Sequence, residues 1–438
     1  MLSFYLITDL HYFENSLGAC GEAYEARSLT DQKCIAETGA IIDAAFAQIA
    51  ADTQINLVLI AGDLTFNGEA ASHEAVIAKL NALKAGGKTV CLITGNHDSD
   101  HEAYAFAGTE RIEVEGTRRE DLAQLYRNFG LSDAIAVDST NTCYVVQLSK
   151  GVRMLGINHD LDKKNRGLEQ HMDWICQQIK DAKQSNNLIF GMMHVPILPG
   201  SPILAPIDDA TIYDSQTIAA QLADAGMPLI FTGHMHMQSV NKLVTPSGNF
   251  IFDICTGSVV GGPCALRKIS IDTNRIMRIT TETVHDFDWD KNGMTAEEYF
   301  IWRFNRKIAH EISSGLDGKC YAKLVRRITL GKLARLLCFC AHPSLKNKRL
   351  PDIAIELVRN VFYGDQPYTA GTPEHQYAMK LLARLRPFVR LAEKKLAPKH
   401  ALFGDFPALA SQLMGKAQKI DNNAVVDLRQ GIVTELDA

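Results

Sequence analysis

The sequence lacks any long hydrophobic run. Its most apolar stretches, such as Leu57–Ala61, end within a few residues at Gly or Asp, whereas a helix that spans a bilayer needs about 20 apolar residues. The opening residues, Met1–Thr8, contain no basic residue before Asp9, so they resemble a first strand more than a secretory signal peptide. We therefore expect no transmembrane segment and a cytoplasmic protein.

Closely paired cysteines are also missing. The ten cysteines are scattered from Cys20 to Cys340 without a CxxC pair, which is typical of reduced thiols and not of a disulfide framework. Cys338, Cys340 and His342 form one cluster. On the helix expected over Lys332–Cys340, side chains that are two residues apart point about 200° away from each other. We therefore interpret the cluster as a buried helix face and not as a soft-metal site.

The composition has none of the biases of fibres or disordered chains. Hydrophobic residues make up 46% and charged residues 22%, with 31 Gly and 14 Pro. A chain of 438 residues is long for one core, which predicts two domains. The net charge of −5 is unevenly divided, because residues 287–438 carry 24 Lys and Arg against 16 Asp and Glu. This basic part has two interpretations, solvated helix faces or a positive rim that attracts anions.

Up to about residue 287, short β-rich runs alternate with amphipathic stretches, the pattern of an α/β domain. The expected strands are Ser3–Thr8, Leu57–Ala61, Thr89–Thr94, Thr142–Gln147, Arg153–Ile157, Leu188–Met193, Leu229–Thr232, Asn249–Ile254 and Ala265–Ile271. The expected helices are Ile35–Ala51, Glu74–Ala85, Leu168–Gln184 and Asp214–Ala225.

Beyond Glu297 no stretch is typical of a core strand. The sequence there predicts helices over Ala296–Ser314, Tyr321–Cys340, Pro351–Phe362, Glu374–Leu396 and Phe406–Lys419. We therefore expect a catalytic domain over residues 1–287 and an all-α domain over residues 288–438.

Short polar motifs follow five of the expected strands. They are Asp9-Leu10-His11, Gly62-Asp63, Gly95-Asn96-His97-Asp98, His194 and Gly233-His234-Met235-His236. Because the carboxyl ends of strands present the site of an α/β sheet, five separate segments can meet there. All these residue types are metal ligands, and a carboxylate such as Asp63 has two oxygens with which to bridge two cations about 3.5–4 Å apart.

With these five motifs in this order, the chain resembles the calcineurin-like metallophosphoesterase superfamily over roughly residues 3–286. The resemblance implies a four-layer α/β/β/α sandwich and a site with two metal ions. It makes Asp9, His11, Asp63 and His236 the ligands of one metal, and Asp63, Asn96, His194 and His234 those of the other. Purple acid phosphatases have a Tyr ligand where this sequence has Phe66. A tyrosinate–iron site is therefore excluded, and Mn, Fe or Zn is expected.

The same resemblance implies a mechanism for phosphoester hydrolysis. A hydroxide that bridges the metals would attack phosphorus, and His97 would assist the leaving group, while Asp98 would hold and polarise the His97 imidazole.

A longer string, Gly62–Glu69 followed by Ser72-His73, is similar to the branch that contains class III cyclic nucleotide phosphodiesterases, some with a helical C-terminal domain. Small anionic phosphodiesters, cyclic nucleotides among them, are therefore the favoured substrates. The alternatives are a phosphomonoesterase or nucleotidase of the same fold, and a non-catalytic metal-binding scaffold that uses its helical domain for partners. Nuclease activity is a third option, although no known nucleic-acid motif is present. The sequence leaves the oligomeric state open.

Overall fold

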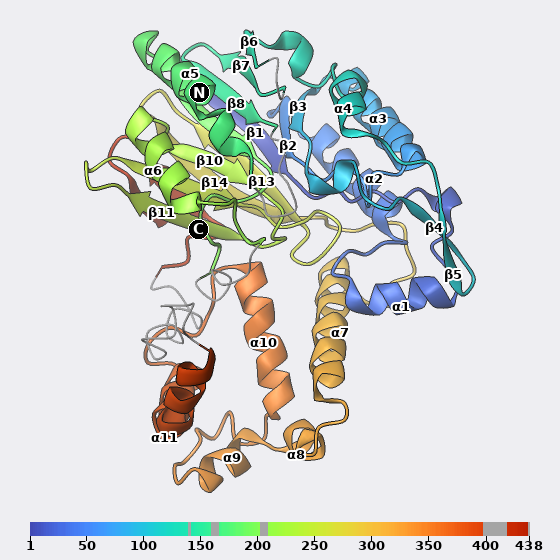
Figure 1. Ribbon diagram of the computed structural model, residues 1–438, viewed down its shortest axis with the longest axis vertical. Coiled ribbons are helices and arrows are strands. Elements are labelled where there is room, and N and C mark those ends of the chain that lie inside the picture. The colour runs from blue at the N-terminus through green and yellow to red at the C-terminus, as the bar shows by residue number, and fades with distance from the viewer. Residues whose placement is uncertain (139–141, 159–165, 202–208, 397–417, 437–438) are drawn as a thin grey trace.

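Two seven-stranded sheets form the centre of the molecule (Figure 1). The computed structural model describes residues 1–138, 142–158, 166–201, 209–396 and 418–436. The first sheet has the order β16-β15-β14-β13-β1-β2-β3 and the second β11-β12-β10-β9-β8-β7-β6. The strands of the first are β1 (Leu2–Ile7), β2 (Leu57–Ala61), β3 (Thr89–Ile93), β13 (Ala265–Ile271), β14 (Ile276–Thr283), β15 (Ala424–Asp427) and β16 (Ile432–Glu435). Those of the second are β6 (Ala136–Val137), β7 (Tyr144–Ser149), β8 (Val152–Ile157), β9 (Leu188–Met193), β10 (Leu229–Thr232), β11 (Ser239–Val244) and β12 (Phe250–Cys255).

Alternation along the strands sorts the side chains into layers. Phe4 and Leu6 of β1 point between the two sheets, where the Phe4 ring stacks 5.8 Å from that of Phe190. Tyr5 and Ile7, the neighbours in sequence, belong to the core on the opposite face of the first sheet. This is the period of two that a strand imposes, and it gives each sheet two buried faces.

Helices cover both outer faces. On the first sheet α2 (Thr38–Ala51) and α3 (Ala70–Ala85) supply part of the outer core, and on the second α5 (Met172–Gln184) and α6 (Ser215–Ala225) do the same. The four-layer α/β/β/α arrangement is thus confirmed. Two helices that the sequence did not predict, α1 (Glu22–Thr30) and α4 (Arg119–Leu125), and the small hairpin β4–β5 (Tyr104–Ala107 and Glu110–Glu113) complete this part.

The region after residue 287 contains helices, as expected. They are α7 (Ala296–Leu316), α8 (Ala322–Arg327), α9 (Leu330–Leu336), α10 (Leu350–Tyr363) and α11 (Pro373–Leu396), and Figure 1 shows them to one side of the sheets. Thr295 and Glu298 form a reciprocal capping box at the start of α7. In the described part of the chain, no helix is long and apolar enough to cross a bilayer.

Several details of this region differ from the prediction. The single helix expected over Tyr321–Cys340 is divided into α8 and α9, and the second ends before Cys338, whose φ is 58°. Cys338 and Cys340 are exposed, so the expected buried helix face is wrong. The helix expected over Phe406–Lys419 lies almost entirely outside the described residues.

The last residues correct the expectation of an all-α end. β15 pairs antiparallel with β14, and β16 pairs with β15. Ala424, Val426 and Leu428 lie in the core between the sheets, because alternate residues of this short segment face the same side. At the other end of the region, Phe287 and Tyr299 pack into the outer core with Tyr5. The domain boundary near residue 288 stays a prediction.

A fully buried arginine ties the C-terminal strands to the second sheet. Arg267 on β13 donates to Asp421 O (2.8 Å), to Cys255 O (3.0 Å) and to the hydroxyl of Thr256 (3.0 Å). Burial lowers the pKa of this guanidinium to about 10, which leaves it charged at neutral pH. Its hydrogen bonds therefore fix the segment that leads into β15.

We predict that Arg267→Met destabilises the protein by about 3 kcal/mol, since two buried carbonyls and a hydroxyl lose their donor. Urea unfolding measures this change in free energy. Arg278→Met on β14 is the control, because Arg278 is half exposed and its nearest carboxylate, that of Asp272, lies 3.8 Å away; we expect a change below about 1 kcal/mol there. Equal losses in the two variants would contradict the assigned role of Arg267.

Candidate metal centre

The five polar motifs meet where the two sheets present their carboxyl ends. Three of them follow β1, β2 and β3, which pair in parallel in the first sheet. The other two follow β9 and β10, which pair in parallel in the second sheet. Each sheet therefore contributes loops to the same place, as expected for parallel strands.

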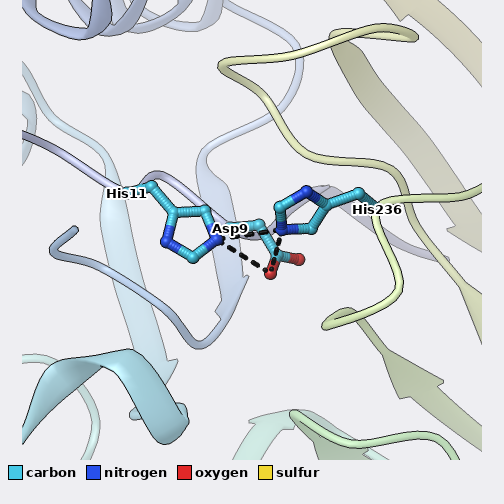
Figure 2. A group of neighbouring side chains, drawn as sticks. All are labelled: Asp9, His11 and His236. Carbon is cyan, nitrogen blue, oxygen red and sulfur yellow. Dashed lines mark hydrogen bonds and ion pairs between the residues drawn. The ribbon is translucent and has the colours of Figure 1, made fainter. Parts of the chain in front are cut away.

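Asp9, His11 and His236 form one compact group (Figure 2). Figure 2 shows the three side chains pointing toward one another, the first two from the segment after β1 and His236 from the segment after β10. The Nε2 atoms of His11 and His236 lie 2.9 Å apart, and Asp9 Oδ1 lies 3.5 Å and 3.2 Å from them. A carboxylate oxygen and two imidazole nitrogens thus surround one point.

Asp63, His194 and His234 form a second group beside it. Asp63 Oδ2 lies 3.1 Å from His194 Nε2 and 3.5 Å from His11 Nε2, so this carboxylate stands between the two groups. Asn96 Oδ1 lies 3.0 Å from His234 Nδ1. The structure therefore brings all seven expected ligands together, and their role as ligands stays a prediction.

The backbone at these residues is strained. Asp9, His11, Asp63, His234 and His236 all have positive φ values, between 38° and 65°. Non-glycine residues avoid this left-handed region at a cost of about 1 kcal/mol each, and such strain gathers at functional sites. Sharp left-handed turns, and not the alternation of an extended segment, therefore direct the side chains of Asp9, His11, His234 and His236.

Glycines in the motifs serve two different purposes. Gly62 has a φ of 92°, which requires the freedom of glycine. Gly95, in contrast, has an extended backbone, and a Cβ there would lie 2.2 Å from Asp63 Oδ1. A Cβ on Gly233 would lie 2.6 Å from Asp9 Oδ2. At these two positions glycine leaves room for the carboxylates of neighbouring segments.

The ionised carboxylates of Asp9 and Asp63 favour the binding of positive charge at the site. Although burial alone raises them, the pKa values of Asp9 and Asp63 lie well below normal because of the surrounding histidines. Burial lowers the pKa of His194, but the two carboxylates outweigh it and raise the value to about 9. Asp9 Oδ1 and His194 Nε2 are buried, and their contacts with His236 and Asp63 are ion pairs without the geometry of a hydrogen bond. Carboxylate and imidazole atoms left in this state fit metal ions.

The expected contact between Asp98 and the His97 imidazole is wrong. His97 Nδ1 instead lies 2.8 Å from Phe66 O and 3.0 Å from the side-chain oxygen of Asn67. The Asp98 carboxylate accepts from the backbone N–H groups of Leu64 (2.7 Å), Thr65 and Gly95. It has turned toward these donors because three buried N–H groups would otherwise lack acceptors, and it thereby ties the segment after β2 to that after β3.

The sequence analysis missed three residues around His97. The ring of His101 stacks on it at a centroid distance of 4.8 Å, Asn67 bonds it, and Lys33 Nζ lies 3.5 Å from its Nε2. No spacing or motif singles out Lys33 or His101. His73 is buried away from the ligands and lies 2.9 Å from the carbonyl of Asp98, so it supports the turn.

A cavity of about 310 Å³, as outlined by the described residues, lies beside the second group. Asn96 and His194 line one side of it. Its other walls include the largely apolar side chains Leu92, Leu122, Tyr126, Phe129 and Tyr144. The site therefore has room for an organic group next to the second set of ligands.

Comparison with known proteins identifies the relatives of this arrangement. The sequence model described as calcineurin-like phosphoesterase matches residues 2–238. No curated protein matches the chain by sequence.

Solved structures give low similarities. The chain is similar to a dimetal phosphatase from Danio rerio (14% identity, TM-score 0.46, 65% of this chain and 96% of that one). It is also similar to a purple acid phosphatase from yellow lupin (12% identity, TM-score 0.42, 68% of this chain and 52% of that one). A third similar structure is a putative 5′-nucleotidase from Staphylococcus aureus (12% identity, TM-score 0.39, 81% of this chain and 71% of that one). Similarities at this level say nothing about the substrate.

We predict that Asp98→Asn lowers the affinity for Mn²⁺ about 10- to 100-fold. An amide has one acceptor oxygen, so its NH₂ group would face one of the N–H donors that Asp98 now satisfies, and the two ligand-bearing segments would separate. Isothermal titration calorimetry measures the affinity, with Asp43→Asn on the exposed face of α2 as the control. Unchanged metal affinity in the Asp98 variant would contradict this positioning role.

Proposed function

The chain belongs to the calcineurin-like phosphoesterase family, and on that premise we propose that it hydrolyses phosphodiesters with the help of two metal ions. The observation that carries the proposal is the pair of adjacent groups of candidate ligands, with the Asp63 carboxylate between them. We further propose that cyclic nucleotides are among the substrates, on the sequence resemblance given above.

We propose Asp9, His11, Asp63 and His236 as ligands of one ion, and Asp63, Asn96, His194 and His234 as ligands of the other. Mixed imidazole and carboxylate ligands suit Mn, Fe or Zn. Phe66 cannot coordinate, and its ring packs 5.5 Å from that of Phe13 in an aromatic cluster. Metal ions bound there would supply positive charge for the phosphoryl oxygens and acidify a water molecule.

The cavity supports the preference for diesters. A phosphodiester carries an organic group on two oxygens, whereas a monoester carries one. Asn96 and His194 border the 310 Å³ cavity, while His97 stands near the other group of ligands, with its ring 4.9 Å from that of His11. One ester group would lie in the cavity, and the leaving group would lie beside His97.

The orientation of His97 identifies the nitrogen that would face the leaving group. A carbonyl oxygen can only accept, so the 2.8 Å contact with Phe66 O places a hydrogen on Nδ1, and Nε2 would have to take up a second proton before it could donate to the leaving group. The backbone N–H of His97 donates to Asp63 Oδ1 (2.8 Å), which fixes the residue relative to the shared carboxylate.

None of the ten cysteines, all of which lie in the described ranges, forms a disulfide, which is consistent with the cytoplasmic location that we propose. Reduced thiols are typical of that compartment.

Activity with added Mn²⁺ tests the ester class. We expect bis-p-nitrophenyl phosphate to be hydrolysed with a kcat/KM at least tenfold that of p-nitrophenyl phosphate, and 2′,3′- and 3′,5′-cyclic nucleotides extend the comparison to natural diesters. A preference for the monoester would overturn the diester proposal and favour a phosphomonoesterase or nucleotidase. No hydrolysis of any ester by a protein with two bound metals would favour a binding scaffold.

We predict that Asp63→Asn loses at least one of the two metals, because an amide offers a single weakly basic oxygen to the position that the carboxylate shares. Elemental analysis of the purified protein measures the metal content.

His97→Ala should retain both metals while kcat falls by about 10²- to 10⁴-fold. Two metals retained in the Asp63 variant, or both lost in the His97 variant, would contradict these assignments.

A further inference from the structure

A buried lysine stands at the edge of the metal centre. Lys33 belongs to the segment between α1 and α2, and only 6% of its surface is exposed. Its Nζ lies 3.5 Å from His97 Nε2 and 5.0 Å from the centre of the Phe66 ring. It thus lies beside the same residue to which we assign the leaving group.

The Lys33 ammonium has no close counter-ion. Within the described parts of the chain, no carboxylate oxygen lies within 4.0 Å of Nζ, and His97 is its one polar side-chain contact. Burial accordingly lowers the pKa of Lys33, while the more distant Asp31 and Asp63 raise it. A buried ammonium without an anion is unfavourable in a folded protein. This position is therefore suited to an anionic group that a ligand brings with it.

Both neighbours of Lys33 are anchored, which fixes its backbone. The side chain of Gln32 donates to Gly262 O (2.8 Å), and the backbone N–H of Cys34 donates to Val260 O (2.8 Å). The N–H of Lys33 itself donates to Asp31 Oδ1 (3.0 Å). The lysine is therefore held against the loop that follows β12 and does not depend on His97 for its position.

Hydrogen-bond roles identify Lys33 as the cationic donor of this pair. His97 carries its hydrogen on Nδ1, toward Phe66 O. Its Nε2 faces an ammonium group, which has donors and no acceptor, so Nε2 accepts. An anionic oxygen that approaches this corner would find the Lys33 ammonium as a ready donor.

We propose that Lys33 binds an oxygen of the substrate's phosphoryl group beside His97, as a substrate-binding residue that none of the five motifs contains. The inference rests on the proposed function and deepens it, because it adds to the site a positive charge that does not come from a metal. The interaction is a charge-assisted hydrogen bond. It is available to any anionic phosphoryl group and involves no change of covalent bonds.

Binding of inorganic phosphate to the Mn²⁺-loaded protein tests this proposal by calorimetry. In Lys33→Met we expect the Kd for phosphate to rise at least tenfold while both metals remain bound. Lys33→Arg should recover part of the affinity, since it restores the charge. The Tm of Lys33→Met should equal or exceed that of the wild type, because a buried unpaired charge is removed.

Lys88→Met is the matched control. Lys88 is as buried as Lys33, but its ammonium bonds the carbonyls of Asp52 and Ile55 far from the site. We expect its Tm to fall and its phosphate Kd to stay unchanged.

An unchanged phosphate Kd in Lys33→Met would overturn the proposal, and a lower Tm with that unchanged Kd would assign Lys33 a structural role. The two proposals can fail separately. A wild type that binds phosphate through Lys33 but hydrolyses no ester would overturn the proposed function alone. A wild type that hydrolyses diesters, with Lys33→Met unaffected in Kd and KM, would overturn the role of Lys33 alone.

Discussion

Parallel hydrogen bonding among the strands that lead into the site is the constraint on which the site depends. The register of β1 with β2, and of β2 with β3, ends these strands side by side, and β9 and β10 do the same in the other sheet. The aromatic core between the sheets, with Phe4 against Phe190 and Phe231, holds the two rows of strand ends face to face. The loops that follow these strands are far apart in sequence, and they therefore place their polar side chains at one site.

This arrangement leaves the molecule with buried charges of both signs. Asp9 and Asp63 are buried among imidazoles, which balance them only in part. Strained turns at five of the seven candidate ligands are tolerated because the sheets on either side determine the path of the chain. Away from the site Arg267 is also fully buried, but each of its three guanidinium nitrogens donates to an oxygen of the protein. The contrast between Arg267 and the incompletely satisfied metal centre distinguishes a structural charge from one that is suited to a ligand.

Much of the fold was predictable from hydrophobic patterning. Leu57–Ala61, Leu188–Met193, Leu229–Thr232 and Ala265–Ile271 form strands with the predicted bounds. The first three are buried parallel strands, which are short apolar runs bounded by turn residues. β11, β14 and the C-terminal β15–β16 hairpin were missed. Buried and exposed residues alternate along β11 and β14, and all four strands pair antiparallel with their neighbours. Strands of this kind are favoured by their partners more than by their own composition.

The sequence by itself determined the family, the layered α/β class and the seven candidate ligands. The reason is that short motifs in a set order, each after a run of apolar residues, can be recognised without knowledge of the tertiary structure. Only the tertiary structure decided what surrounds them. In the structure the Asp98 carboxylate accepts from three backbone N–H groups and does not contact the His97 imidazole. Gly95 and Gly233 leave the space that the carboxylates need, and Lys33 lies beside His97. Apart from the bond between Gly95 and Asp98, these contacts join residues that are 30 or more positions apart. The physical reason is that such contacts arise from the packing of loops against one another, which no local periodicity or spacing encodes.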